Sequence, residues 1–134
     1  MQVDTLALAW ATHRIGGVQT PANAAYSVAE LEHQLRDSGA KCLFTVLPLL
    51  DTAVQACKTV GIPENRIFIL EMPEVATAGF SGKGFRTVSD LVNLGGSLPK
   101  TEELQLAKGE GAKRIAFLCY SSGTSGLPVG TIVR

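Results

Sequence analysis

Charge and aromatic side chains are both scarce in this chain of 134 residues. Charged residues make up 18% of the sequence and aromatic residues 6%, whereas soluble domains are usually about 25% charged. Twelve Lys and Arg residues balance twelve Asp and Glu residues, and no segment gathers enough positive charge to follow a phosphate backbone. We therefore expect no nucleic-acid partner. The apolar fraction of 46% is that of a globular protein, and its excess over charge is typical of a piece of a larger core.

Cysteines are few, and long hydrophobic runs are absent. Cys42, Cys57 and Cys119 are odd in number and lack the Cys-x-x-Cys spacing of zinc sites. They stand among apolar residues, which favours buried, reduced thiols over a disulfide framework and predicts an intracellular location. The apolar stretch over residues 6–11 is too short to cross a bilayer, and residues 1–4 lack the basic start of a secretion signal. We expect no membrane span.

Hydrophobic periodicity predicts helices that alternate with short apolar strands. The clearest helix start is Ser27-Val28-Ala29-Glu30, a capping box in which the Ser hydroxyl and the Glu carboxylate each satisfy a backbone N–H. The expected strands are nearly continuous in apolar residues, as are strands buried on both faces of a parallel sheet. The predicted class is therefore α/β, a sheet with flanking helices. Helices are expected over residues 4–14, 28–37, 50–60 and 88–94 and strands over residues 41–46, 66–70 and 115–120, with residues 71–113 otherwise a surface excursion.

The most informative segment is a loop rich in hydroxyls and glycines. It follows the apolar strand that ends at Tyr120, and four hydroxyls and three glycines occupy residues 121–130. Glycines let backbone N–H groups approach a phosphate closely, and hydroxyls donate to its oxygens, so the pattern predicts a nucleotide phosphate site. The lysine and the following helix of the common P-loop are both missing, because β-branched residues 131–133 favour a second strand. By composition alone, a flexible surface loop remains the alternative.

Residues 120–128, Tyr-Ser-Ser-Gly-Thr-Ser-Gly-Leu-Pro, resemble the phosphate-loop motif of the AMP-forming acyl-CoA ligases, a family that includes 4-coumarate–CoA ligase-like enzymes, luciferases and peptide-synthetase adenylation domains. An upstream block running from Gly16 through residues 21–23 to residues 37–41 is similar to the same family, and the two motifs come in the expected order. The sequence looks most like fungal ligases of secondary metabolism. The resemblance implies that residues 1–134 are a partial adenylation domain, part of the large N-terminal domain and truncated at both ends relative to the family.

The resemblance also implies a reaction in two halves. A carboxylic acid attacks the α-phosphorus of ATP to give an acyl-adenylate and pyrophosphate, and coenzyme A then displaces AMP. The loop would hold the β- and γ-phosphates, with Mg²⁺ sharing their charge. No catalytic residue and no metal ligand is expected within this chain, and the cytoplasm and the peroxisome are the compartments implied. The resemblance assigns nucleotide binding to Ser121, Ser122, Gly123, Thr124, Ser125, Gly126, Pro128 and Gly130.

The sequence departs from the family at one loop position and leaves three functions open. The family usually has a lysine where this chain has Val129, and valine supplies no charge, so weaker ATP binding or altered loop geometry is expected.

Three interpretations of the whole chain stay open: an acyl-CoA ligase fragment that is inactive alone, a stand-alone nucleotide-binding module, or a non-catalytic remnant. A fragment should leave its last strand exposed and apolar. We expect His13 and His33, which stand alone on predicted helices, to be solvated, and Trp10 to pack against the core.

Overall fold

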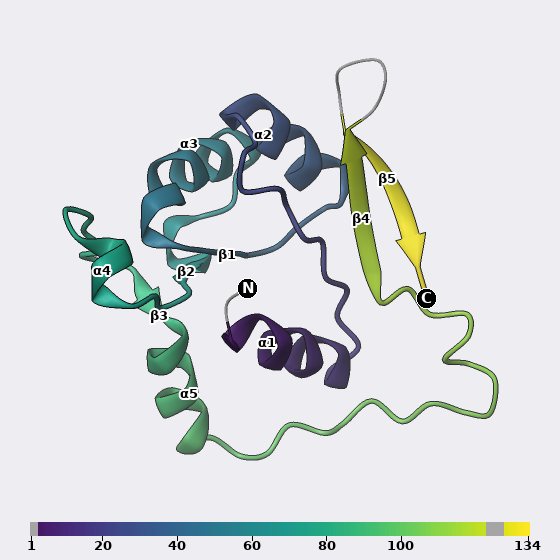
Figure 1. The fold of residues 1–134 in the computed structure, drawn as a ribbon. Helices are drawn as coiled ribbons and strands as arrows, with labels where there is room; N and C mark the ends of the chain where they lie inside the picture. Colours follow the sequence, from purple (N-terminus) through teal and green to yellow (C-terminus); the bar gives the residue numbers. More distant parts are fainter. Residues whose placement is uncertain (1–2, 123–127) are drawn as a thin grey trace.

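The computed structural model describes residues 3–122 and 128–134 of the chain (Figure 1). The helices predicted from the sequence are present, and the short strands alternate with them as expected. The elements in chain order are α1 (Val3–Arg14), α2 (Val28–Asp37), β1 (Leu43–Thr45), the 3₁₀ turn η1 (Leu47–Leu49), α3 (Leu50–Val60), the 3₁₀ turn η2 (Glu64–Arg66), β2 (Ile67–Ile69), α4 (Glu74–Thr77), β3 (Arg86–Thr87), α5 (Val88–Gly96), β4 (Phe117–Ser122) and β5 (Pro128–Val133).

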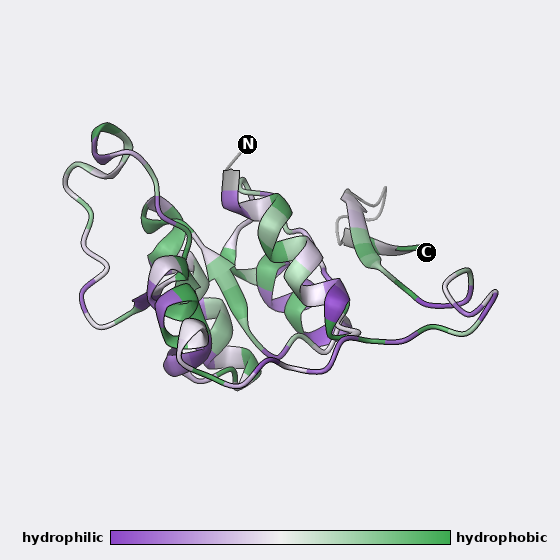
Figure 2. Ribbon diagram, turned by 90° about the horizontal axis from the view of Figure 1, so that it is seen from below, coloured by the Kyte–Doolittle hydropathy of each residue, from purple (hydrophilic) through white to green (hydrophobic). Residues whose placement is uncertain are grey.

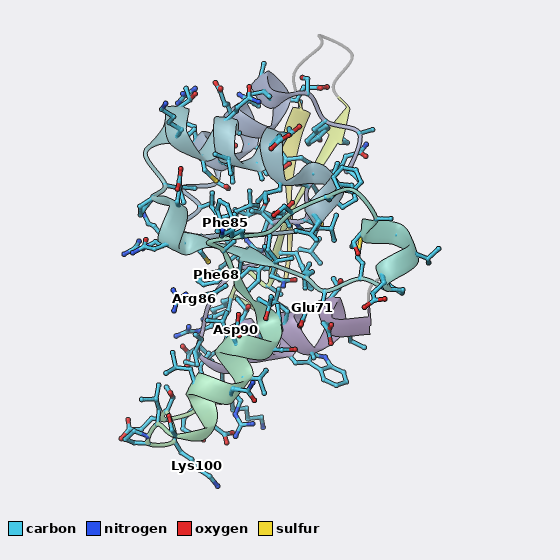
Figure 3. All side chains as sticks on the ribbon, turned by 90° about the vertical axis from the view of Figure 1, so that its left-hand side faces the viewer. Phe68, Glu71, Phe85, Arg86, Asp90 and Lys100 are labelled. Carbon is cyan, nitrogen blue, oxygen red and sulfur yellow. The ribbon has the colours of Figure 1, made fainter. Side chains whose placement is uncertain are left out.

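Three short strands form a parallel sheet in the order β1-β2-β3. Phe44 pairs with Phe68, and Phe68 pairs with Arg86 on the other side. Figures 1 and 3 place α2 and α3 on one side of this sheet and α1 on the other. The predicted α/β class is confirmed. The excursion predicted over residues 71–113 is wrong in part, because it contains the third strand, which is only two residues long and begins with an arginine.

The main core lies between the sheet and the α2–α3 pair. Ile67 and Ile69 of β2 face it and are almost completely buried, which is worth about 1.5–3 kcal/mol for each side chain. Phe68, between them, points to the opposite face, where its ring lies 5.0 Å from that of Phe44. The continuous apolar run of β2 therefore reflects burial on both faces. The helical partners in the core cluster are Leu31, Leu35, Leu50, Ala56 and Cys57.

Specific polar residues set the helix ends. The predicted capping box at α2 is present: the backbone N–H of Ser27 donates to the Glu30 carboxylate at 2.8 Å, and the Glu30 N–H donates back to the Ser27 hydroxyl. Gly61 ends α3 in the left-handed conformation, with φ of 81°. A second capping box, formed by Thr87 and Asp90, starts α5. These caps fix the start of α2, the end of α3 and the start of α5.

The two C-terminal strands form a separate antiparallel hairpin. β4 and β5 pair in register from Phe117 with Val133 to Ser122 with Pro128. Figures 1 and 2 show this hairpin to one side of the helices, joined to α5 by a long segment. Its link to the rest of the chain includes Gln19, which forms a parallel bridge with Phe117. The two predicted strands are confirmed, and the residues between them, 123–127, lie outside the described part of the chain.

Two expectations about burial are wrong. Trp10 is 67% exposed and is not packed in a core, because the described residues cover only part of α1, whose middle is hydrophobic (Figure 2). Cys42 is exposed, whereas Cys57 is buried as expected, and all three cysteines are free. Burial raises the pKa of Cys57 to about 11. Among the described residues, no helix is long and apolar enough to cross a membrane.

Candidate functional site: the base of the C-terminal hairpin

The described residues of the predicted phosphate loop lie where β4 ends and β5 begins. Ser121 and Ser122 belong to β4 and pair with Val129 and Pro128 of β5, so the strands extend further into the motif than the sequence suggested. Ser121 is exposed, and so is Val129 opposite it. The antiparallel pairing brings the two ends of the loop together. Four of the assigned residues lie outside the part of the chain that the structure describes: Gly123, Thr124, Ser125 and Gly126.

The open end of the hairpin is tied to the segment after α1. The Gln19 backbone N–H donates to the Ala116 carbonyl at 3.1 Å, and the Leu118 N–H donates to the Gln19 carbonyl at 2.8 Å. The next residue, Thr20, is in turn held by Gln34 of α2, whose Nε2 donates to the Thr20 hydroxyl at 2.7 Å. The helix, the connecting segment and β4 thus form one hydrogen-bonded chain.

A second tie lies next to the loop. The Tyr120 hydroxyl donates to Asp37 Oδ2 at 2.5 Å, across 83 positions of sequence. Desolvation and the neighbouring Asp37 carboxylate raise the pKa of Tyr120 to about 12. Gly130 pairs with Tyr120 across the hairpin, and a Cβ on Gly130 would lie only 3.2 Å from the tyrosine Cζ. Tyr120 therefore packs over the bare backbone of β5 and reaches the end of α2.

His13 supports the start of β4. Its Nε2 lies 3.0 Å from the Ala116 carbonyl oxygen, and its ring meets that of Phe117 edge to face, with centroids 4.8 Å apart. The expectation that this histidine is solvated is wrong, because its ring is partly buried against the strand. An imidazole N–H that donates to a backbone carbonyl is a structural contact. It places the C-terminal end of α1 beside the hairpin.

A second polar cluster lies at the carboxyl ends of the parallel strands (Figure 3). Glu71 follows β2 and accepts hydrogen bonds from the Ser89 N–H, at 3.1 Å, and from the Ser89 hydroxyl. The Thr87 N–H and hydroxyl hold the pKa of Asp90 below its usual value. Both carboxylates thus stabilise the positive N-terminal end of α5. Glu71 borders an open, mainly apolar hollow of about 260 Å³, lined by Leu47, Ile69, Glu71, Met72, Thr77, Gly82 and Thr87.

The described residues offer no metal site made of side chains. Among residues 3–122 and 128–134, no three His, Cys, Asp or Glu side chains come together as a ligand set. The Arg86 guanidinium lies over the Phe68 ring at 5.1 Å and donates to the Asn65 carbonyl, so it stabilises the parallel sheet (Figure 3). Next to the loop, the described residues present the exposed Ser121 and the Tyr120 hydroxyl, which is bound to the Asp37 carboxylate.

Comparison with known proteins identifies the family. A family model described as AMP-binding enzyme matches residues 1–134. The chain belongs to the AMP-binding enzyme family. Acyl-CoA ligase AFT1-1 of Alternaria alternata is 39% identical over 125 residues, covering 92% of this chain and 21% of that ligase. Acyl-CoA ligase cm3C of Cordyceps militaris is 30% identical over 128 residues, covering 93% and 20%. The resemblance seen in the sequence is confirmed, and this member of the family spans about one fifth of the length of these fungal relatives.

Solved structures agree on the fold. A red-emitting luciferase from Phrixothrix hirtus matches with a TM-score of 0.76 at 18% identity, over 99% of this chain and 24% of the luciferase. The anthranilate CoA ligase AuaEII, solved in complex with anthranoyl-AMP, matches with a TM-score of 0.69 at 22% identity, over 92% of this chain and 21% of the ligase. The architecture is that of a partial N-terminal domain of adenylate-forming enzymes.

Sequence reasoning missed the side chains that hold the hairpin in place. Gln34 and Asp37 lie on the predicted second helix, where polar residues are ordinarily read as solvated. Gln34 is in fact 1% exposed, and its position three residues from Leu31 and next to Leu35 on the buried stripe was the available signal. Nothing in the sequence signals that Asp37 meets Tyr120.

Proposed function

We propose that this chain is the phosphate-binding part of an acyl-CoA ligase. Such a ligase activates a carboxylic acid with ATP through an acyl-adenylate and then transfers the acyl group to coenzyme A. The observation that carries the proposal is the hairpin: its strands pair up to Ser122 and Pro128, and they join through a segment of hydroxyls and glycines. Family membership and the fungal acyl-CoA ligases it resembles support the reaction type and a role in secondary metabolism.

The residues of the hairpin have separate tasks in this proposal. The hydroxyl of Ser121 is exposed at the base of the loop and donates to a phosphate oxygen of ATP. Ser122, Thr124 and Ser125 add further hydroxyls, while Gly123 and Gly126 let backbone N–H groups approach the phosphates. Mg²⁺, when bound with ATP, neutralises part of the phosphate charge. Holding the β- and γ-phosphates keeps the α-phosphorus in line for attack by the carboxylate.

The exposed surface supports a partial domain over a self-contained module. Leu6 and Trp10 of α1 are 55% and 67% exposed, and Ile132 on the outer strand of the hairpin is 52% exposed. Apolar side chains on an edge strand and on an exposed helix favour burial against further protein. We therefore propose that residues 1–134 are a partial adenylation domain and that the acyl pocket and the catalytic groups lie outside it.

The test is exchange of labelled pyrophosphate into ATP by the native full-length product, with a panel of carboxylic acids. We expect exchange that depends on an acid and falls at least tenfold in a Thr124→Ala/Ser125→Ala variant, because each lost hydroxyl bond to a charged group is worth about 1.5–3 kcal/mol. Thr59→Ala, on the exposed end of α3, is the matched control. Absence of exchange with every acid, together with tight ATP binding, would support a stand-alone nucleotide-binding module. Absence of both would indicate a non-catalytic remnant.

A further inference from the structure

Three residues meet at the loop end of the β4–β5 hairpin, immediately before the loop leaves β4. Tyr120 supplies a hydroxyl, Asp37 a carboxylate, and Gly130 a stretch of backbone without a side chain. We propose that Tyr120 and Asp37 form a latch that positions the hairpin for phosphate binding, with Gly130 providing the space for the tyrosine ring. The role of this latch rests on the function proposed above, and it makes Tyr120 and Asp37 positioning residues.

The carboxylate of the latch is exposed, but the helix that carries it is anchored at its start and in its middle. Asp37 is the last residue of α2, whose start is fixed by the capping box at Ser27. In the middle of the helix, Leu31 and Leu35 are buried in the main core, and Gln34 is tied to Thr20. A hydrogen bond to Asp37 therefore connects Tyr120 to the most firmly packed part of the described chain.

The tyrosine side of the latch controls the hairpin near the loop. An isolated two-stranded hairpin is at best marginally stable in water, so this one depends on ties to the rest of the chain. The Gln19 contacts hold the far end, at Ala116 and Leu118. Tyr120 lies next to Ser121, and its bond to Asp37 holds the end from which the loop leaves. Without the latch, that end can twist away from α2, and Ser121 at the start of the loop is no longer held in place.

Gly130 is a structural partner of the latch. A Cβ there would lie 3.2, 3.3 and 3.4 Å from the Cζ, Cε1 and hydroxyl oxygen of Tyr120. The first two distances are shorter than ordinary van der Waals contacts, and the ring is also held by Asp37. The resemblance to the ligases assigned Gly130 to nucleotide binding. Its place in the hairpin adds a second reason for glycine, which is to let the ring cross β5.

The experiment measures binding of pyrophosphate with Mg²⁺ to the native full-length product and to three variants. Tyr120→Phe removes only the hydroxyl, Asp37→Asn removes the charge, and the double variant removes both. We expect each single variant to raise Kd about tenfold, equivalent to about 1.4 kcal/mol, and the double variant to be no worse than either. Tyr26→Phe is the matched control, because none of the described residues bonds the Tyr26 hydroxyl, and its Kd should not change. Asp37→Glu, which keeps the carboxylate, should restore part of the affinity.

Two further readouts separate positioning from general loss of stability. In the latch variants KM for ATP should rise while KM for coenzyme A stays constant; a merely structural role would lower the thermal midpoint and weaken both. The pKa of Tyr120 can be measured from the difference between the ultraviolet pH titrations of wild type and Tyr120→Phe. In the wild type it should be about 12. Asp37→Asn and Gly130→Ala should both bring it closer to the ordinary value of about 10.

The outcomes separate the latch from the function it rests on. If Thr124→Ala/Ser125→Ala weakens pyrophosphate binding and the latch variants do not, the latch is wrong and the phosphate loop stands. If Thr124→Ala/Ser125→Ala leaves binding unchanged, the proposed function fails and the latch fails with it. Loss of affinity in both sets, with a double variant equal to the single ones, supports both.

Discussion

Gln34 provides a sharp test of how the hairpin is tied to the core. Its side chain is 1% exposed, and Nε2 donates to the Thr20 hydroxyl at 2.7 Å and to the Pro21 carbonyl at 3.1 Å. Since a carbonyl can only accept, the amide nitrogen must face Pro21. Its oxygen, Oε1, is then left buried without a hydrogen-bond partner among the described residues. The two acceptors at Thr20 and Pro21 therefore select a donor at this position.

Two substitutions at Gln34 should differ sharply. Gln34→Leu loses two hydrogen bonds worth about 1 kcal/mol each but also removes the unpaired oxygen, so we expect a net loss of about 1 kcal/mol. Gln34→Glu buries a carboxylate opposite the Pro21 carbonyl, and we expect a loss of about 3–5 kcal/mol at neutral pH, typical of an uncompensated buried charge. In both variants Thr20 should be held less firmly, and the backbone pairing of Gln19 with β4 should weaken.

The assay is chemical denaturation of the native product together with amide hydrogen exchange at Gln19 and Leu118. Exchange at both amides should accelerate in the order wild type, Gln34→Leu, Gln34→Glu. Gln55→Leu and Gln55→Glu, made at an exposed position of α3, are the matched controls and should stay within about 0.5 kcal/mol of wild type. Equal stability of Gln34→Leu and Gln34→Glu would refute the reasoning, because it would mean that the site is open to water.

The remaining predictions concern thiols, a helix cap and the loop. Desolvation raises the thiol pKa of both Cys42 and Cys57, to about 11 at Cys57, but Cys42 is exposed and Cys57 is buried, so Cys42 should be alkylated first; mass spectrometry gives the order, and faster labelling of Cys57 would contradict it. The pKa of Asp90 is lowered in the folded chain, so its contribution to stability is present above the unfolded pKa of about 3.9 and is lost as pH falls through the folded value. The stability gap between wild type and Asp90→Asn should therefore shrink below about pH 4, and a gap that is constant with pH would be inconsistent with this. Val129→Lys should lower the Kd for ATP with Mg²⁺ in the native product, since position 129 is exposed beside Ser121 and a lysine there adds a positive charge; an unchanged Kd in calorimetry would sink the idea.

Local signals in the sequence were sufficient for most of the helices. The capping box at Ser27 and the glycine after α3 each act within a few residues, so the boundaries of α2 and α3 follow from the sequence alone. The near-continuous apolar run of β2 predicted its burial on both faces. The capping box of α5 at Thr87 carries the same kind of signal as that of α2.

Long-range contacts explain what the sequence could not predict. β3 is recognisable only through its pairing with Phe68, because two residues carry no periodicity. Trp10 was expected in a core, yet exposure depends on what packs against α1 and not on the helix itself. The motif located the candidate loop, but the ties from Asp37 and Gln34 join segments far apart in the chain, which spacing rules do not reach.

The most direct test of the phosphate site is amide hydrogen exchange of the native full-length product with and without pyrophosphate and Mg²⁺. Our account predicts new protection that is concentrated in residues 121–130 and is reduced in Tyr120→Phe. Two results would contradict the placement of the phosphate site in this hairpin. One is protection confined to other segments, such as those that line the hollow beside Glu71, and the other is no new protection at saturating pyrophosphate.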